Sequence, residues 1–270
     1  MTPSLPVVHR TGTPPVVLLA WALGAAAILT QMVFPFTDGG SNRLTILSVV
    51  LLSAAALVHV TATRGPTSAL GLLLVAGGGG LVAEAVGVHT GIPFGSYDYT
   101  GTLGPEVLGV PAVVPLAWLM MAYPALLAAR RLAGSYRPLV PVLAGWALTT
   151  WDVFLDPQMV DAGHWRWDHP TPSLPGVEDI PLTNFAGWLV VAVVMCTVLD
   201  RVVARTPRAA TDGDLLPLTV FLWTYASSVL AHALFFGRPP VALVGGLLMG
   251  TVAIPLAVQL VRRHRREGGS

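Results

Sequence analysis

The stretch P-V-L-A-G-W-A-L-T-T-W-D-V-F-L-D-P, at residues 141–157, decides how this chain is interpreted. It is apolar enough for a membrane helix, yet it carries two aspartates, Asp152 and Asp156, four residues apart. This spacing places both carboxyl groups on one face of a helix. Ionisable side chains are costly inside a bilayer, and those found there usually face a protein interior or a wet cavity. The stretch therefore predicts a membrane helix that carries a functional site.

The composition also indicates an integral membrane protein. The chain of 270 residues is 54% hydrophobic and only 11% charged, whereas soluble domains are about 25% charged. The net charge of +1 gives no indication of a nucleic-acid partner. The single cysteine, Cys196, excludes an intrachain disulfide and argues against a thiolate metal site.

Eight apolar stretches are long enough to cross about 30 Å of hydrocarbon at about 1.5 Å per residue. We expect them at residues 16–34, 44–62, 68–87, 110–129, 139–155, 185–203, 215–236 and 240–260. The predicted fold is an all-α, polytopic membrane helical bundle. It forms one domain, residues 13–261, between tails at 1–12 and 262–270 that we expect to be disordered. Only a short turn separates the last two stretches, so seven spans with a re-entrant segment is the alternative.

The arginines predict the orientation of the bundle. With both termini inside, twelve arginines fall on the inner side and three on the outer side, as expected for cytoplasmic loops. We therefore expect a multi-pass protein of the cell membrane with both termini cytoplasmic. Two long connections, about 88–109 and 157–184, then lie outside, together with ten of the fourteen acidic residues.

Three acids are the candidate catalytic residues. Two carboxyl groups in a poorly hydrated site can hold one proton between them, and an acid kept neutral can donate it. The alternative for Asp156 is that Asp156-Pro157 only ends a helix at the interface. Glu84 follows four consecutive glycines, residues 77–80, whose small size lets helices approach closely. We expect Glu84 to be buried together with Asp152 and Asp156, although a glutamate that reaches out to the interface is the alternative.

The two long connections supply aromatic side chains. Tyr97 and Tyr99 are spaced by two residues, as are Trp165 and Trp167, so in an extended segment each pair points to one side. Phe94 precedes the first pair. Aromatic faces stabilise positive charge that develops beside them. An ordinary interfacial belt of aromatic residues is the alternative.

Two polar residues give weaker signals. Asn184 begins the sixth stretch, where helix N-capping explains it as well as catalysis does. His232 lies near the outer end of the seventh stretch, where a structural role is the alternative. The chain has no metal-binding histidine box, no Walker loop and no G-x-G-x-x-G after a strand. We expect no metal and no cofactor.

Five segments occur in a fixed order within residues 84–190. They are G-I-P-F-G-S-Y-D-Y-T at 91–100, G-V-P-A-V-V-P-L-A-W at 109–118, W-D-V-F-L-D-P at 151–157, G-H-W-R-W at 163–167 and N-F-A-G-W at 184–188. In this ordered set the chain resembles the carotenoid-biosynthesis membrane proteins, a family that includes the bisanhydrobacterioruberin and gamma-carotene hydratases. The family usually has Gly-Val-Pro shortly before Asn-Phe, whereas this chain has G-V-E-D-I-P at 176–181.

The resemblance implies a lyase of isoprenoid metabolism, a hydratase. Such an enzyme adds water to the terminal carbon–carbon double bond of an acyclic (psi) carotenoid end group and forms a tertiary alcohol. The residues suit this chemistry, because it needs an acid to protonate the alkene, a shelter for a tertiary cation and a base for the attacking water. Asp152 or Asp156 would donate the proton, with Glu84 assisting. The predicted substrate-binding residues are Phe94, Tyr97, Tyr99, Trp165, Trp167, Asn184, Trp188 and His232.

The implied partners are a lipid-soluble carotenoid, membrane lipids and other enzymes of the pathway. Two other classes of protein remain open, a membrane carrier and a non-catalytic carotenoid-binding scaffold. A carrier would also use intramembrane acids, but near the midplane and often with internal repeats. A scaffold would need the aromatic residues and not the acids.

Overall fold

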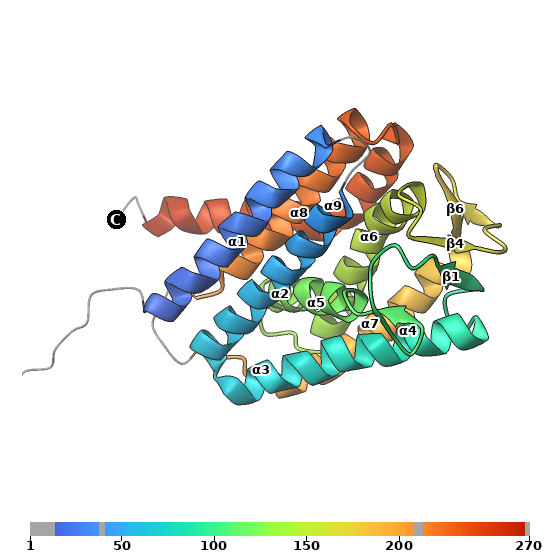
Figure 1. Cartoon of the computed structure of the whole chain (residues 1–270). Coiled ribbons are helices and arrows are strands. Elements are labelled where there is room, and N and C mark those ends of the chain that lie inside the picture. The colour runs from blue at the N-terminus through green and yellow to red at the C-terminus, as the bar shows by residue number, and fades with distance from the viewer. Residues whose placement is uncertain (1–13, 38–40, 208–212, 268–270) are drawn as a thin grey trace, which may run out of the picture.

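The structure, a computed structural model, describes residues 14–37, 41–207 and 213–267. These residues form eight continuous helices packed into one bundle (Figure 1). The first two helices are α1 Pro15–Val33 and α2 Asn42–Arg64. The third is one continuous helix made of α3 Pro66–Leu72, η2 Leu73–Gly78 and α4 Gly79–Thr90. The remaining helices are α5 Val114–Ala133, α6 Leu139–Asp161, α7 Leu182–Val202, α8 Leu215–Leu234 and α9 Pro239–Glu267. A single turn, η1 Phe34–Phe36, follows α1. The predicted polytopic all-α bundle is confirmed.

Seven helices in the described ranges are long and apolar enough to cross a membrane. The remaining helix, α5, has 20 residues, or about 30 Å at the helical rise, and 13 of these residues are buried. It packs against α2, α4, α6, α7, α8 and α9. A helix enclosed by other helices faces little lipid, so its composition can be less apolar than that of its neighbours. The chain is a multi-pass membrane protein with α5 at its centre.

Two predicted boundaries differ from the structure, and one alternative is excluded. Pro157 lies inside α6, which continues to Asp161, so the interpretation that Asp156-Pro157 ends a helix is wrong. Membrane helices tolerate such a proline when neighbouring groups satisfy the freed backbone. Helix α9 continues to Glu267, so the predicted disordered tail is helical from 262 to 267. The tail 1–12 lies outside the described residues. The turn before Pro239 separates two full helices and gives no re-entrant segment.

The two long connections fold into three small antiparallel sheets of two strands each in the described residues. The strands are β1 Tyr97–Tyr99 with β4 Trp165–Trp167, β2 Glu106–Val107 with β3 Val110–Pro111, and β5 Ser173–Leu174 with β6 Val177–Pro181. They gather beside the ends of α4, α6 and α7 (Figure 1). The pair β1–β4 joins the first long connection to the second. It therefore closes one end of the bundle.

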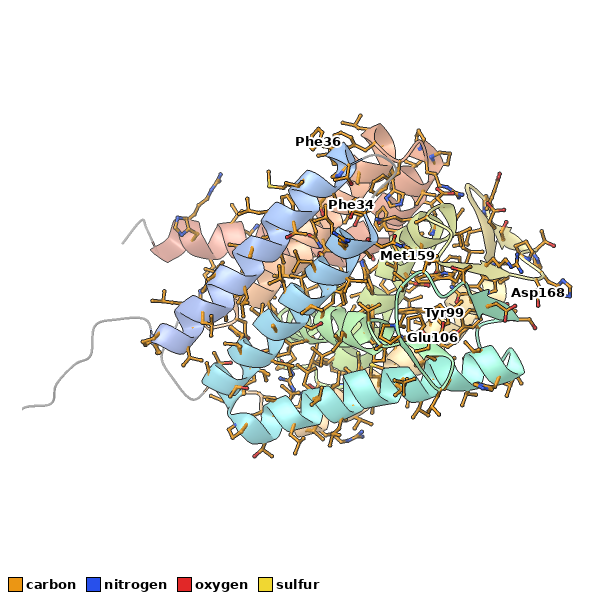
Figure 2. The ribbon with its side chains drawn as sticks, viewed as in Figure 1. Phe34, Phe36, Tyr99, Glu106, Met159 and Asp168 are labelled. Carbon is orange, nitrogen blue, oxygen red and sulfur yellow. The ribbon has the colours of Figure 1, made fainter. Side chains whose placement is uncertain are left out.

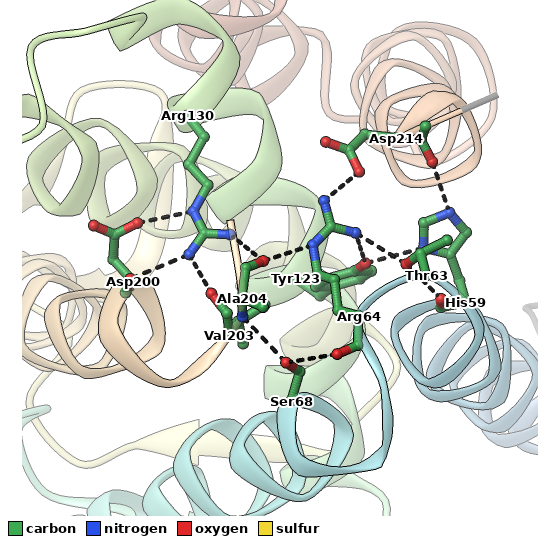
Figure 3. Close-up of polar contacts among 11 residues, drawn as sticks. His59, Thr63, Arg64, Ser68, Tyr123, Arg130, Asp200, Val203, Ala204 and Asp214 are labelled. Carbon is green, nitrogen blue, oxygen red and sulfur yellow. Dashed lines mark hydrogen bonds and ion pairs between the residues drawn. The ribbon is translucent and has the colours of Figure 1, made fainter. Parts of the chain in front are cut away.

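The opposite end of the bundle is held by buried charge (Figure 3). Arg64, at the end of α2, is 1% exposed and pairs with Asp214 before α8. Its guanidinium also donates to the hydroxyl of Tyr123 at 2.9 Å and to the carbonyl of Ala204 at 2.9 Å. A second arginine, Arg130 of α5, pairs with Asp200 of α7 at 2.8 Å. Removing one partner of such a buried pair is costly, so these contacts fix the ends of α2, α5, α7 and α8.

Candidate active site

Helix α6 buries both aspartates of the stretch 141–157. Asp152 is fully buried and Asp156 is 3% exposed. They lie one turn apart on the same helical face, as the spacing predicted. Two carboxylates held this close together repel each other, so the site favours one proton shared between them.

Asn184, which lies on the neighbouring helix α7, bridges the two aspartates. Its side-chain nitrogen donates to Oδ2 of Asp152 at 3.0 Å and to Oδ2 of Asp156 at 2.5 Å. The alternative that Asn184 caps a helix is wrong, because Pro181 occupies the N-cap position and Asn184 lies in the first turn. A close contact brings α7 to α6, since a Cβ atom on Gly145 would lie 2.5 Å from Val193. One amide therefore organises both carboxyl groups.

The remaining polar contacts distinguish the two aspartates. Trp165 of β4 donates its indole N–H to Oδ1 of Asp156 at 3.2 Å. Oδ1 of Asp152 is buried and has no hydrogen-bond partner among the described residues. An unpaired buried acceptor is uncommon in folded proteins and often marks a functional site. Among the described residues, Oδ1 of Asp152 is therefore the acceptor atom of the pair that remains open to a further donor.

Glu84 of α4 is buried on the face that packs against α5. This packing is close, because a Cβ atom on Gly80 would lie 2.8 Å from the ring of Trp118. The carboxylate of Glu84 accepts three hydrogen bonds, from Trp118 at 2.9 Å, Tyr97 at 2.5 Å and Tyr99 at 2.9 Å. The alternative of an exposed interfacial glutamate is wrong, since Glu84 is 5% exposed. Its three donors hold it in one orientation.

The strand pair β1–β4 supplies an aromatic wall. Tyr97 is opposite Trp167 and Tyr99 is opposite Trp165 in the antiparallel register. Both tryptophans are 8% exposed, so the two-residue spacing places all four rings on the inner side, as predicted. Burial, followed by the nearby Glu84 carboxylate, raises the pKa of Tyr97 and Tyr99 well above the ordinary tyrosine value. Their hydroxyl groups therefore remain donors to Glu84.

A second pair of rings completes the wall. Trp118 of α5 and Trp188 of α7 are stacked, with ring centroids 3.9 Å apart and planes 8° from parallel. Phe94 packs near Trp188 at a centroid distance of 6.4 Å. Rings in these positions present π faces and edges to the space between them.

These groups surround a cavity, which we call the acid chamber. Nine of the eleven residues predicted for the site line it: Glu84, Phe94, Tyr97, Tyr99, Asp156, Trp165, Trp167, Asn184 and Trp188. Asp152 lies directly behind Asp156 and Asn184 and is not part of the lining. Figure 2 shows Tyr99 beside the sheet at this end of the molecule.

His232 is separate from the acid chamber. Its ring packs against Phe154 and Phe236, and Nδ1 meets the carbonyl of Ser228 at 2.9 Å. The structural alternative therefore describes its position better than the predicted contact with a substrate. Trp118, by contrast, was not predicted for the site although it contacts Glu84. The sequence feature that could have identified Trp118 as a site residue is its place in the ordered segment 109–118.

The comparisons with known proteins agree with this architecture. The family model described as "Carotenoid biosynthesis protein" matches residues 43–253. A curated relative, "Bisanhydrobacterioruberin hydratase" of Haloarcula japonica, is 34% identical over 123 residues. That alignment covers 43% of this chain and only 40% of the relative. No solved structure matches. Because the family match extends over most of the chain and includes the acid chamber, this protein belongs to the carotenoid biosynthesis protein family.

Proposed function

We propose that this protein is a carotenoid hydratase, a hydro-lyase acting on the terminal double bond of an acyclic carotenoid end group. The product is a tertiary alcohol, and the reaction uses no cofactor. The single observation that carries the proposal is a pair of buried carboxyl groups, Asp152 and Asp156, bridged by Asn184 at an aromatic cavity. The name of the Haloarcula relative supports the same reaction class.

The reaction begins with proton transfer from the aspartate pair. Asp156 lines the chamber and would deliver the proton to the outer carbon of the alkene. A new C–H bond forms, the π bond breaks, and the inner carbon becomes a tertiary cation. Asp152 and Asp156 accept hydrogen bonds from the same Asn184 amide. Asp152 would therefore share the proton and the negative charge left behind. The pair starts with one proton and ends this step with none.

The second step is the addition of water. The oxygen of a water molecule bonds to the cation, and the aspartate pair takes up the proton that this water loses. The pair returns to its starting state, and the sum is one water added to one double bond. Glu84, held in one orientation by three donors, would assist the pair. The surrounding rings would stabilise the cation.

The position of the chamber suits a substrate that is part lipid and part reactive end. Its lining comes from the long connections and from the helix ends next to them. Water is available at a membrane surface, while the hydrocarbon part of a carotenoid belongs in the bilayer. We propose the cell membrane as the location, with both termini cytoplasmic and the chamber near the outer face. Membrane lipids and other enzymes of the pathway are the proposed partners.

Expression in cells that accumulate an acyclic carotenoid tests the proposal. The expected product is heavier than its precursor by one water. Asp156→Asn should reduce the rate by about 10²–10⁴-fold, the usual contribution of a general acid. Asp98→Asn is the matched control, because Asp98 is exposed on β1 between two chamber residues.

The outcomes separate the remaining protein classes. Altered distribution of an unchanged pigment would indicate a carrier or a scaffold and would refute the hydratase. Full activity of Asp156→Asn would refute the assignment of the acid.

A further inference from the structure

A second and larger cavity lies beside the acid chamber. We call it the lateral cavity. Its walls come from the last turns of α1, from η1, from the first half of α2, from Met120 and Met121 of α5, from the second half of α6, and from α8 with the two residues after it. All of these segments lie at the end of the bundle that carries the acid chamber.

The two cavities share one wall. Five residues line both of them: Thr45, Val49, Met120, Leu155 and Met159. Four of these five side chains are apolar. In Figure 2, Met159 lies between Tyr99 of the acid chamber and Phe34 of the lateral cavity. A long hydrocarbon could pass this wall without meeting a charge.

The far end of the lateral cavity reaches the apolar surface of the bundle. Phe36 is 77% exposed and Leu230 is 53% exposed, and both line the cavity. The seam between α1 and α8 is closed by few contacts here. Trp223 donates to the side-chain oxygen of Gln31 at 2.7 Å, and Phe34 meets Phe236 edge to face at 6.1 Å. Exposed apolar side chains at this end suit contact with lipid.

We propose that the lateral cavity binds the conjugated chain of the substrate while its end group occupies the acid chamber. This inference rests on the proposed function and adds the location of the polyene. The acid chamber alone is lined closely by rings and acids, so a long chain must leave it through a wall. The shared wall is apolar and leads to a lipid-facing opening. A linear polyene is the chemical class that fits such a path, because it is long, narrow and without charge.

Filling the lateral cavity far from the acids tests this assignment. Ala231 of α8 lines the lateral cavity and not the acid chamber. Ala233, two residues further along α8, is exposed and lines neither cavity. Each would be replaced by phenylalanine in the full chain, reconstituted in lipid vesicles. The substrates are a long acyclic carotenoid and a short acyclic polyene with the same terminal double bond.

Ala231→Phe should reduce hydration of the long substrate at least tenfold, which corresponds to about 1.4 kcal/mol. It should leave hydration of the short substrate within twofold of wild type. Ala233→Phe should change neither rate. Activity of Ala231→Phe on the short substrate also shows that this variant is folded.

Equal effects of Ala231→Phe on both substrates, or no effect on either, would overturn the placement of the chain. If the wild type hydrates neither substrate, the proposed function itself fails. If the wild type hydrates both and Ala231→Phe behaves like Ala233→Phe, only the inference about the lateral cavity fails.

Discussion

Gly80 is the point where α4 passes closest to Trp118, so Gly80→Ala tests how the aromatic wall is held. A Cβ atom at this position would lie 2.8 Å from Cγ and 2.9 Å from Cβ of Trp118. Rotation of the side chain cannot relieve the second contact, because Cβ is attached to the backbone of α5. The ring of Trp118 is also confined, since it is 1% exposed and stacks on Trp188. The two helices must therefore separate slightly.

Two opposing effects set the change in the free energy of unfolding. Alanine in place of glycine within a helix stabilises by about 1 kcal/mol. Extra atoms in a tightly packed interior cost about 1–3 kcal/mol. Gly78→Ala is a matched control, because a Cβ atom on Gly78 has no other atom within 4 Å. Since both variants gain the helical preference, we expect Gly80→Ala to be less stable than Gly78→Ala by about 1–3 kcal/mol.

The assay is denaturant unfolding in detergent micelles, followed by near-ultraviolet circular dichroism of the tryptophans. Hydration activity is measured on the same samples. Gly80→Ala should lose activity as well as stability, because a displaced Trp118 no longer holds Glu84 at 2.9 Å. Equal stability of the two variants would refute the close packing of α4 on α5.

Two further changes test the polar contacts around the chamber. Asn184→Ala removes the donor shared by the two aspartates, and we expect the hydration rate to fall by about 10²-fold, as for a misplacement of about 1 Å. The adjacent exposed Thr183→Ala is its control, and equal rates for the two would contradict the bridging role. Burial lowers the pKa of His164, which meets Thr102 at 2.7 Å. The unfolded chain then binds the proton more readily, so stability should be highest above about pH 6.5 and fall as the pH decreases towards the lowered value. Thermal unfolding between about pH 5 and about pH 8 should show this slope in the wild type and a flatter one in His164→Gln.

The eight helices and their order followed from the positions and lengths of the apolar stretches. Each apolar stretch is long enough to span hydrocarbon, and a chain cannot leave such stretches in water. The alternation of Tyr97 with Tyr99 and of Trp165 with Trp167 also predicted their shared side, because side chains alternate along any strand. Burial of Asp152 and Asp156 followed from the cost of a carboxyl group beside lipid.

Local rules failed where distant helices meet. A proline after Asp156 predicts a helix end, yet α6 continues past it to Asp161. Asparagine at the start of a helix is typical of an N-cap, yet Asn184 donates hydrogen bonds to carboxyl groups 28 and 32 residues away. His232 lies at the same end of the bundle as the acids but on the far side of Phe154.

The sequence by itself determined a membrane bundle with buried acids and aromatic connections at one end, because hydrophobic length and strand alternation are properties of neighbouring residues. Only the tertiary structure decided which acid faces the chamber, which amide bridges the pair, and that Trp118 binds Glu84. It also decided that the acid chamber and the lateral cavity share a wall. These features depend on how helices far apart in the chain pack together, and that packing is set by contacts such as Gly80 on Trp118 that no local pattern encodes.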